Sequence, residues 1–339
     1  MTLTRTKSRV LDAESRADSR ADMRRAPAYR ALAPIGGNRL TLLGALLAGM
    51  LAMGTDQPAQ AALRVVAVTP ELASIAKSVG GDRVDVTSLA RPDSDYHKVE
   101  ARPSDVVQVS RADLFVRVGM DLEMWADALL NSARNPKVAK GGPGYVDCST
   151  RIRKLEVPSG QISGASGDIH VLGNPHYWYD PGNAKVIAYE ILLGLRRVDP
   201  QGYKAYDANY ARFGQEIDQR LAAWTRDLAP YKGKPVVAYH AEWTYFYRRF
   251  GLVPFGYLEP KPGIPPSGSH VSSLISRMKQ AGVKCVIVPS IYPLRFPEMI
   301  GRETGARLAR VPYSVGSLGT KDYIGYLDLV VSSVRKALQ

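Results

Sequence analysis

The chain has little cysteine. Only Cys148 and Cys285 occur among its 339 residues, which excludes a small scaffold held together by several disulfides. The two could pair in an oxidising compartment, but they fall in different halves of the chain and Cys285 lies within an apolar segment that is expected to form a strand. We therefore expect two buried free thiols.

The sequence also lacks an apolar run that is long enough to span a membrane. Residues 40–53 form an apolar run of fourteen residues, whereas a bilayer core about 30 Å thick needs about 20. With Arg39 before it and small residues at the −3 and −1 positions of a cleavage site after Ala61, this run is typical of an export signal. We predict that residues 1–61 are a signal peptide and leader. The polar lead-in is long, so a translation start at Met23 is an alternative, as is a membrane anchor.

Acidic residues are scarce relative to basic ones, with 32 Asp and Glu against 45 Lys and Arg, a net charge of +13. Such a balance raises nucleic acid as a partner. Without residues 1–61 the charge falls to +9 over 278 residues, and the basic residues that remain are scattered without a basic block. We therefore expect no nucleic-acid partner. A hydrophobic content of 45% excludes a disordered chain and suffices for two ordinary cores.

Beyond residue 61, predicted strands and helices alternate in two halves, which is typical of parallel α/β sheets. Strands are predicted at 63–68, 84–89 and 114–118, then at 235–239, 283–288 and 309–312. Helices are predicted at 70–79, 104–110, 124–132 and 181–199, then at 241–250, 272–280, 297–304 and 323–338. We expect Ser104 to cap its helix, because serine is a favoured N-cap residue. Residues 254–268 are interpreted as a Pro/Gly loop.

Between the two halves, large side chains recur at spacings of three and four. They are Tyr203, Tyr206, Tyr210, Phe213, Ile217, Leu221, Trp224 and Leu228. The spacing predicts one amphipathic helix of about 28 residues, roughly 40 Å long at 1.5 Å per residue. Two shorter helices with a break at Gly214 are the alternative.

Three of the five histidines share one setting, at the end of a predicted element. His97 follows the second strand, His176 precedes the helix that Asp180 caps, and His240 follows the strand that ends at Tyr239. Ligands of open α/β sheets bind outside the carboxyl ends of strands, and neutral imidazole is a good zinc ligand. The spacings match no short zinc motif, so solvated or packed histidines remain an alternative to a metal site.

Three motifs around these histidines resemble those of the zinc/manganese ABC-transporter solute-binding proteins. Residues 91–105 read RPDSDYHKVEARPSD, where that family has a G-x-D-P-H-x-Y-E-P-x-P-S-D segment with its first metal ligand. Residues 174–181 read NPHYWYDP, similar to the second motif, D-P-H-x-W-L-D-P. Residues 239–246 read YHAEWTYF and resemble the third. The resemblance covers essentially all of residues 63–339.

The resemblance implies an α/β fold of two parallel-sheet lobes joined by one long rigid helix. Its parts would be an N-terminal lobe at 62–199, a linking helix at 200–229 and a C-terminal lobe at 230–339. It further implies a monomeric periplasmic receptor, not an enzyme, that captures Zn²⁺ in the cleft between the lobes. The ion would then pass to the membrane permease of an ABC importer.

As the resemblance has it, His97 and His176 would come from the first lobe and His240 from the second. Three histidines favour zinc, because manganese members usually have two histidines and two carboxylates, and nitrogen donors suit zinc better. A manganese-type receptor and a receptor that binds no metal remain alternatives.

The sequence departs from the family at the fourth ligand. The family often has a carboxylate after the strand at 283–288, where this chain has Pro289 and Ser290, and another after the last strand, where it has Tyr313 and Ser314. The fourth ligand could then be water, which would leave an open position as in catalytic zinc sites.

Two further side chains bear on that open position. Asp168 or His170, in the Gly/Ser-rich loop at 158–175, could instead supply the fourth ligand.

A site of three histidines and a water also resembles that of a zinc hydrolase or hydratase, with Glu242 as the nearest candidate base. His270, on the first turn of a helix, is expected to be solvated.

Overall fold

The computed structural model describes residues 61–160 and 167–339. The predicted apolar signal segment at 40–53 and the alternative start at Met23 lie outside the described residues. Among the helices that are described, none combines the length and the apolar character needed to cross a bilayer.

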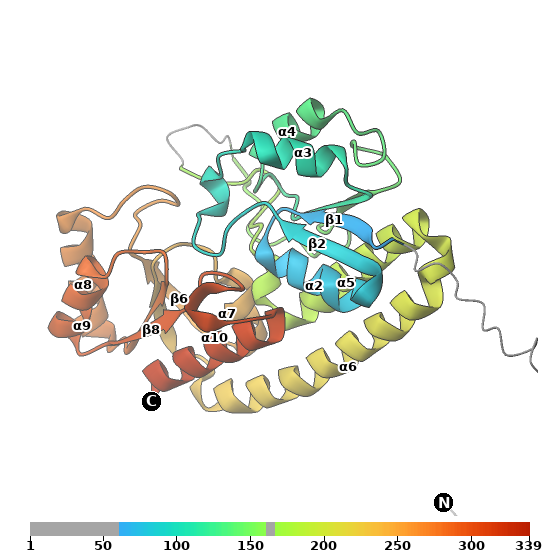
Figure 1. The fold of residues 1–339 in the computed structure, drawn as a ribbon. Coiled ribbons are helices and arrows are strands. Elements are labelled where there is room, and N and C mark those ends of the chain that lie inside the picture. Colours follow the sequence, from blue (N-terminus) through green and yellow to red (C-terminus); the bar gives the residue numbers. More distant parts are fainter. Residues whose placement is uncertain (1–60, 161–166) are drawn as a thin grey trace, which may run out of the picture. The chain divides into compact units, whose positions relative to one another are not determined.

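The described chain contains two four-stranded parallel sheets (Figure 1). The first comprises β1 (Leu63–Ala67), β2 (Val84–Ser88), β3 (Leu114–Arg117) and β4 (Tyr145–Asp147), in the order β2-β1-β3-β4. The second comprises β5 (Pro235–Ala238), β6 (Val253–Tyr257), β7 (Cys285–Pro289) and β8 (Arg307–Val311), in the order β6-β5-β7-β8. The two orders are equivalent, and the predicted fold of two parallel-sheet α/β lobes is confirmed.

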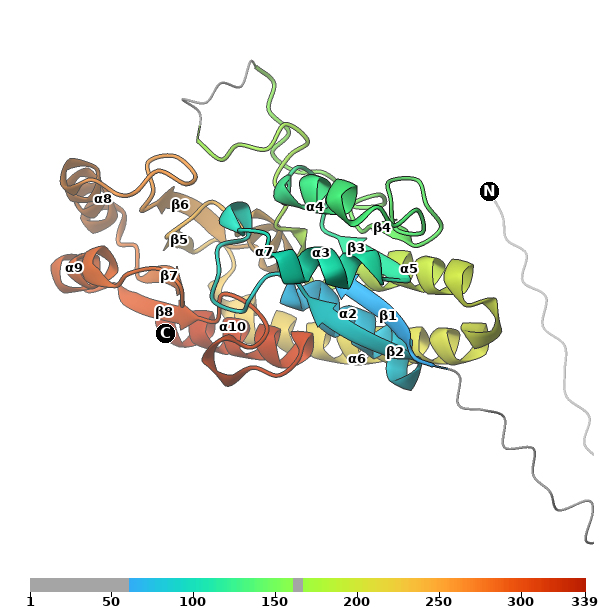
Figure 2. The same ribbon diagram turned by 45° about the horizontal axis from the view of Figure 1, so that its top comes forward.

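Helices follow the strands in both halves of the chain. In the first half they are α2 (Pro70–Gly80), α3 (Pro103–Ser110), α4 (Trp125–Ala133) and α5 (Pro181–Val198). In the second half they are α7 (Thr244–Phe250), α8 (Gly268–Ala281), α9 (Arg295–Thr304) and α10 (Tyr323–Leu338). Figure 2 shows α2 and α5 beside the first sheet and α10 beside the second.

The long helix between the two halves is α6 (Tyr203–Leu228), which continues through Gly214 without a break. Its buried side chains include Tyr206, Phe213 and Ile217, as the periodicity predicts. It packs along α2 and α5 of the first lobe and along α10 of the second. Nε1 of Trp224 donates a hydrogen bond to Oδ1 of Asp328 on α10 at 2.8 Å. One helix therefore contacts both lobes, while the predicted domain boundaries and the rigidity of the helix stay predictions.

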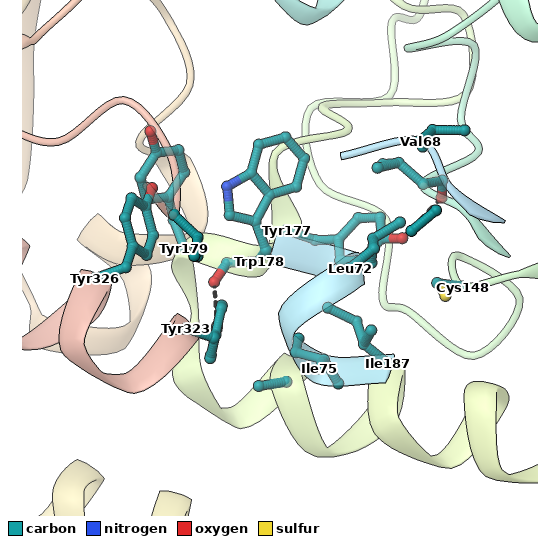
Figure 3. Close-up of a cluster of buried hydrophobic side chains, with 14 of the residues drawn as sticks. Val68, Leu72, Ile75, Cys148, Tyr177, Trp178, Tyr179, Ile187, Tyr323 and Tyr326 are labelled. Carbon is teal, nitrogen blue, oxygen red and sulfur yellow. Dashed lines mark hydrogen bonds between the residues drawn. The ribbon is translucent and has the colours of Figure 1, made fainter. Parts of the chain in front are cut away.

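Buried aromatic side chains fill the space between α2, α10 and the short 3₁₀ turn Tyr177–Tyr179 (Figure 3). Trp178 packs edge-on against Tyr96, with ring centroids 6.0 Å apart. The hydroxyl of Tyr323 on α10 donates to the carbonyl of Trp178 at 2.5 Å. The backbone that directly follows His176 is therefore fixed within a core to which both halves of the chain contribute.

The strand β6 contradicts the interpretation of residues 254–268 as a loop. Pro254 and Gly256 suggested a turn, but β6 lies at the edge of its sheet, where a residue without an N–H is tolerated. The register also shifts between Val236 and Val237 of the neighbouring strand, as at a β-bulge. The sequence analysis missed β4 as well, because three residues are too few for a pattern.

Several helix starts differ from the prediction: α8 begins at Gly268, four residues earlier than predicted, and α9 at Arg295, two residues earlier. The N-cap of α3 is Arg102 rather than Ser104: the N–H of Arg102 donates to the Asp105 carboxylate at 2.8 Å, and Pro103 takes the first helical position, which it suits because it has no N–H to satisfy. Helix α7 begins at Thr244, three residues later than predicted, so the segment that follows His240 is irregular.

Both cysteines are buried and free, as predicted. Burial raises the pKa of the Cys285 thiol to about 12 and that of Cys148 well above its ordinary value. Since the thiolate is the reactive form, a disulfide-exchange reagent should label neither thiol in the folded protein and both after unfolding in guanidinium. A thiol that reacts quickly under native conditions would contradict this burial.

Candidate metal centre

The three predicted histidines converge on one point. Among the residues that the structure describes, His97, His176 and His240 form the one group of histidine, cysteine or acidic side chains suited to a metal ion, and one ligand atom from each lies within 4.8 Å of the others. Their ring centroids are 5.4 to 5.5 Å apart. His176 and His240 are buried, and His97 is partly buried.

Each histidine comes from the segment that follows a strand or precedes a helix. His97 lies in a 3₁₀ turn (Tyr96–Lys98) after β2, and His240 lies two residues after β5. His176 directly precedes the turn that leads into α5, whose N-cap Asp180 accepts from the N–H of Gly182 at 2.8 Å. The carboxyl ends of strands from both sheets thus border the cluster, which is where open α/β sheets bind ligands.

His97 and His176 are held by the same local device. The Oδ1 atom of Asp95, two residues before His97, accepts from the backbone N–H of His97 at 3.0 Å and lies 2.9 Å from its Nδ1. The Oδ1 atom of Asn174, two residues before His176, does the same at 3.1 and 2.9 Å. In both, an Asx turn fixes the backbone and the imidazole ring together.

His240 is held by a residue that follows the neighbouring strand, β6. Oε2 of Glu259 lies 2.6 Å from Nδ1 of His240 and also accepts from the N–H of Gly263 at 2.9 Å. Strands β5 and β6 pair Ala238 with Tyr257, so His240 and Glu259 each lie two residues beyond paired positions. Parallel register therefore brings the two side chains together.

These contacts determine which ring nitrogen is free. Each Nδ1 faces an oxygen that already accepts a hydrogen bond from a backbone N–H, so each Nδ1 is the protonated donor and each Nε2 carries the lone pair. Nε2 of His97 is buried without a partner. Metal-binding histidines in proteins are oriented by such contacts, which raise the basicity of the ligand nitrogen.

The electrostatics favour neutral imidazoles at the centre. Burial, reinforced by the neighbouring histidines, holds the pKa of His176 well below its ordinary value. Burial alone would raise the pKa of Asp95, but the hydrogen bond and charge of His97 lower it to about 2. A partly buried carboxylate thus supports His97, while His176 remains neutral, which is the form that ligates a metal.

The positions that carry a carboxylate in the resembling family have another role here. The N–H of Tyr313 donates to Oγ of Ser290 at 3.1 Å, and the Tyr313 hydroxyl accepts from the N–H of Tyr96 at 3.2 Å. Oγ of Ser314 donates to the carbonyl of Pro92 at 2.7 Å. In place of a fourth ligand, these residues connect the second lobe to the loop that carries His97.

Of the two loop residues offered as a fourth ligand, His170 lies against the cluster. Its ring centroid is 5.3 Å from that of His97 and 6.4 Å from that of His176. Its Nε2 is buried without a partner, and burial, followed by the charge of His97, lowers its pKa to about 4. Asp168 borders the same openings but is not part of the cluster.

His270 lies apart from the cluster. It is partly buried rather than solvated as expected, because its Nε2 lies 3.0 Å from the carbonyl of Tyr257.

Glu242 is placed poorly for a general base. Its Oε2 accepts from the Tyr179 hydroxyl at 3.3 Å, and Oε1 is buried without a partner. Burial raises the pKa of Glu242 well above its ordinary value, with a further contribution from Glu259. The raised pKa favours the protonated carboxyl group, which cannot accept a proton from a water molecule as a general base must.

The acceptors Asp95, Asn174 and Glu259 are not among the site residues predicted from the sequence. The first two were detectable as a repeated Asx-x-His spacing before a turn. Glu259 was not, because its position beside His240 depends on β6, which was interpreted as loop.

Comparisons with known proteins agree with this architecture. Residues 65–337 match the family model described as "Zinc-uptake complex component A periplasmic". The high-affinity zinc uptake system protein ZnuA of Yersinia pestis is 27% identical over 301 residues, covering 84% of this chain and 93% of that protein. The iron-binding protein YfeA of Yersinia pestis is 26% identical over 297 residues, covering 84% and 90%.

Solved structures share the fold. A crystal structure of ZnuA superposes with a TM-score of 0.70 at 23% identity, covering 82% of this chain and all of that one. A ZnuA variant with residues 138–173 deleted and zinc bound gives a TM-score of 0.69 at 24% identity, covering 81% and 98%.

The low pKa of His170 gives a test of the geometry in the protein freed of metal by a chelator. Its imidazole resonance should titrate near pH 4, whereas an unperturbed histidine titrates near 6.5. Since the unfolded chain then binds more protons than the folded one below pH 6.5, this residue's contribution to the free energy of unfolding should fall as the pH falls towards 4.

The stability of a His170→Gln variant, compared with the unaltered chain at pH 7 and pH 4.5, isolates that contribution. The comparison is needed because Glu71 and Glu123, whose pKa burial raises to about 7, titrate with the opposite sign. The described position of His170 would be contradicted if the two proteins differed in free energy of unfolding by the same amount at both pH values and the NMR titration midpoint of His170 lay near 6.5.

Proposed function

Because this chain belongs to the family of periplasmic zinc-uptake component A proteins, we propose that it is an exported receptor that captures Zn²⁺ through His97, His176 and His240 and delivers it to the permease of an ABC importer. The observation that carries the proposal is the convergence of three imidazoles from both lobes, each with its Nδ1 held by an oxygen acceptor. The zinc named for the ZnuA relatives supports the choice of metal.

The donor set favours zinc over manganese. Neutral imidazole suits zinc, copper, iron and nickel, whereas manganese prefers oxygen ligands. The acidic side chains at the site, Asp95 and Glu259, are engaged by Nδ1 atoms and backbone N–H groups. The iron named for the YfeA relative makes iron the ion to test alongside manganese and copper.

Release follows from the division of the ligands between the lobes. His97 and His176 come from segments of the first lobe and His240 from the second, so a separation of the lobes would remove one ligand of three. Three neutral ligands leave the bound ion its charge of two, which favours transfer to a more negative site.

We take residues 1–61 as the leader, 62–199 and 230–339 as the lobes, and 200–229 as their linking helix. We take the receptor to be a monomer without a nucleic-acid partner.

A three-histidine zinc centre would also suit a hydrolase or hydratase. The buried Glu242 with its raised pKa argues against that alternative. Turnover of ester or carbon dioxide substrates by the zinc-loaded protein, if substantial, would overturn a pure receptor.

Replacement of each proposed ligand should abolish tight zinc binding. Calorimetric titration of the metal-stripped protein measures the zinc affinity of His97→Ala, His176→Ala and His240→Ala. The loss in each should exceed that for an outer hydrogen-bond partner, whose removal lowers metal affinity about 10- to 100-fold. His270→Ala, which lies apart from the cluster, is the matched control and should bind like the unaltered chain. Unchanged affinity in all three ligand variants would refute the site.

Removal of an acceptor behind a ligand should weaken binding less. Asn174→Ala and Glu259→Ala release Nδ1 of His176 and His240, so zinc affinity should fall by about 10- to 100-fold. Glu259→Gln can still accept from Nδ1 and should lose less than Glu259→Ala. Equal losses in the two Glu259 variants would contradict the role given to that hydrogen bond.

A further inference from the structure

The segment at 167–174 connects the second lobe to the histidine cluster. The N–H of Asp168 donates to the carbonyl of Pro262 at 2.9 Å, in the turn whose Gly263 N–H is bound by Glu259. At its other end, Asn174 holds His176 and donates through Nδ2 to the carbonyl of Ala241 at 2.8 Å. Both ends of the segment are thus attached to groups that position His176 and His240.

His170 lies midway along this segment and between two openings to the cluster. One opening is bordered by His170 with His176 and His240, and the other by His170 with His97 and Trp125. His170 therefore borders both openings and lies next to His97 and His176.

The free nitrogen of His170 matches those of the cluster. Its Nε2 is buried without a partner, like Nε2 of His97, and the two rings are 5.3 Å apart, close to the spacing within the cluster. The backbone of Asp121 hydrogen-bonds the ring. A buried polar atom without a partner is unfavourable, so a cation bound by both nitrogens would satisfy the two together.

A zinc ion held by the three histidines would need a fourth ligand. Structural zinc sites are almost always four-coordinate, and the cluster supplies three ligands. Tyr313 and Ser314, at one of the two positions where the resembling family has a carboxylate, are bound to the loop at 92–96. Among the described side chains, His170 combines an imidazole nitrogen without a partner with a ring that lies against the cluster.

We propose that His170 is the fourth zinc ligand and that the segment at 167–174 carries it inward when the ion binds. This inference rests on the proposed zinc-receptor function. His170 is not within the 4.8 Å group, so its ring must move towards the other three when it ligates. Because the ligand sits on a segment attached to both lobes, separation of the lobes would disturb the position of His170 as well as that of His240.

The test is X-ray absorption at the zinc edge on the zinc-loaded mature protein, which counts imidazole ligands. The unaltered chain should show four imidazoles and His170→Ala three. Zinc affinity of His170→Ala should fall by at least about tenfold, since even an outer partner is worth about 10- to 100-fold. His270→Ala should retain four imidazoles and full affinity.

The outcomes separate the two proposals. Three imidazoles in both the unaltered chain and His170→Ala, with equal affinity, would overturn the role of His170 and leave the three-histidine receptor intact. Four imidazoles in both would also overturn it, since another histidine would then be the ligand. A protein that binds no zinc at all would overturn the receptor itself. Circular dichroism of each variant establishes that a loss of binding does not come from unfolding.

Discussion

The centre depends on three hydrogen bonds from imidazole Nδ1 atoms to oxygen acceptors. Without them the rings of His97, His176 and His240 could rotate, and each histidine could present either nitrogen. With them, three Nε2 lone pairs face one point before any ion arrives. Nε2 of His97 is buried without a partner, which is unfavourable, so a bound cation would relieve a local cost.

The fold supplies those acceptors by two different routes. For His97 and His176 the acceptor is two residues earlier in the same turn, which makes each a local feature of the chain. For His240 the acceptor Glu259 follows the neighbouring strand of the sheet, so it requires the second lobe to be folded. The lobes are then connected near the site by Asn174, which reaches the carbonyl of Ala241, and by α6 along its length.

Two residues that follow the last strand of the second lobe position the site. Tyr313 and Ser314 hold the loop that bears His97, and Tyr96 in that loop packs against Trp178, the second residue after His176. They join the second lobe to this loop and offer no carboxylate to the site. This leaves the fourth position to a side chain from elsewhere, such as His170.

Much of this was predictable from sequence because it is encoded locally. The alternation of strands and helices, the periodicity of residues 203–228 and the three histidines at element ends all depend on near neighbours in the chain. Glu259 was not predictable, because Pro254 and Gly256 concealed β6 and only the register with β5 places Glu259 beside His240. The approach of His170 to His97 depends likewise on the path of a loop, which no local pattern specifies.

The most direct measurement of the central claim is a crystal structure of the zinc-loaded mature protein with anomalous data collected at the zinc edge. The account predicts one peak between the lobes, about 2.0–2.1 Å from Nε2 of His97, His176 and His240, with each Nδ1 still bound to its oxygen acceptor. A peak elsewhere on the protein, or zinc held through Nδ1 atoms, would contradict it.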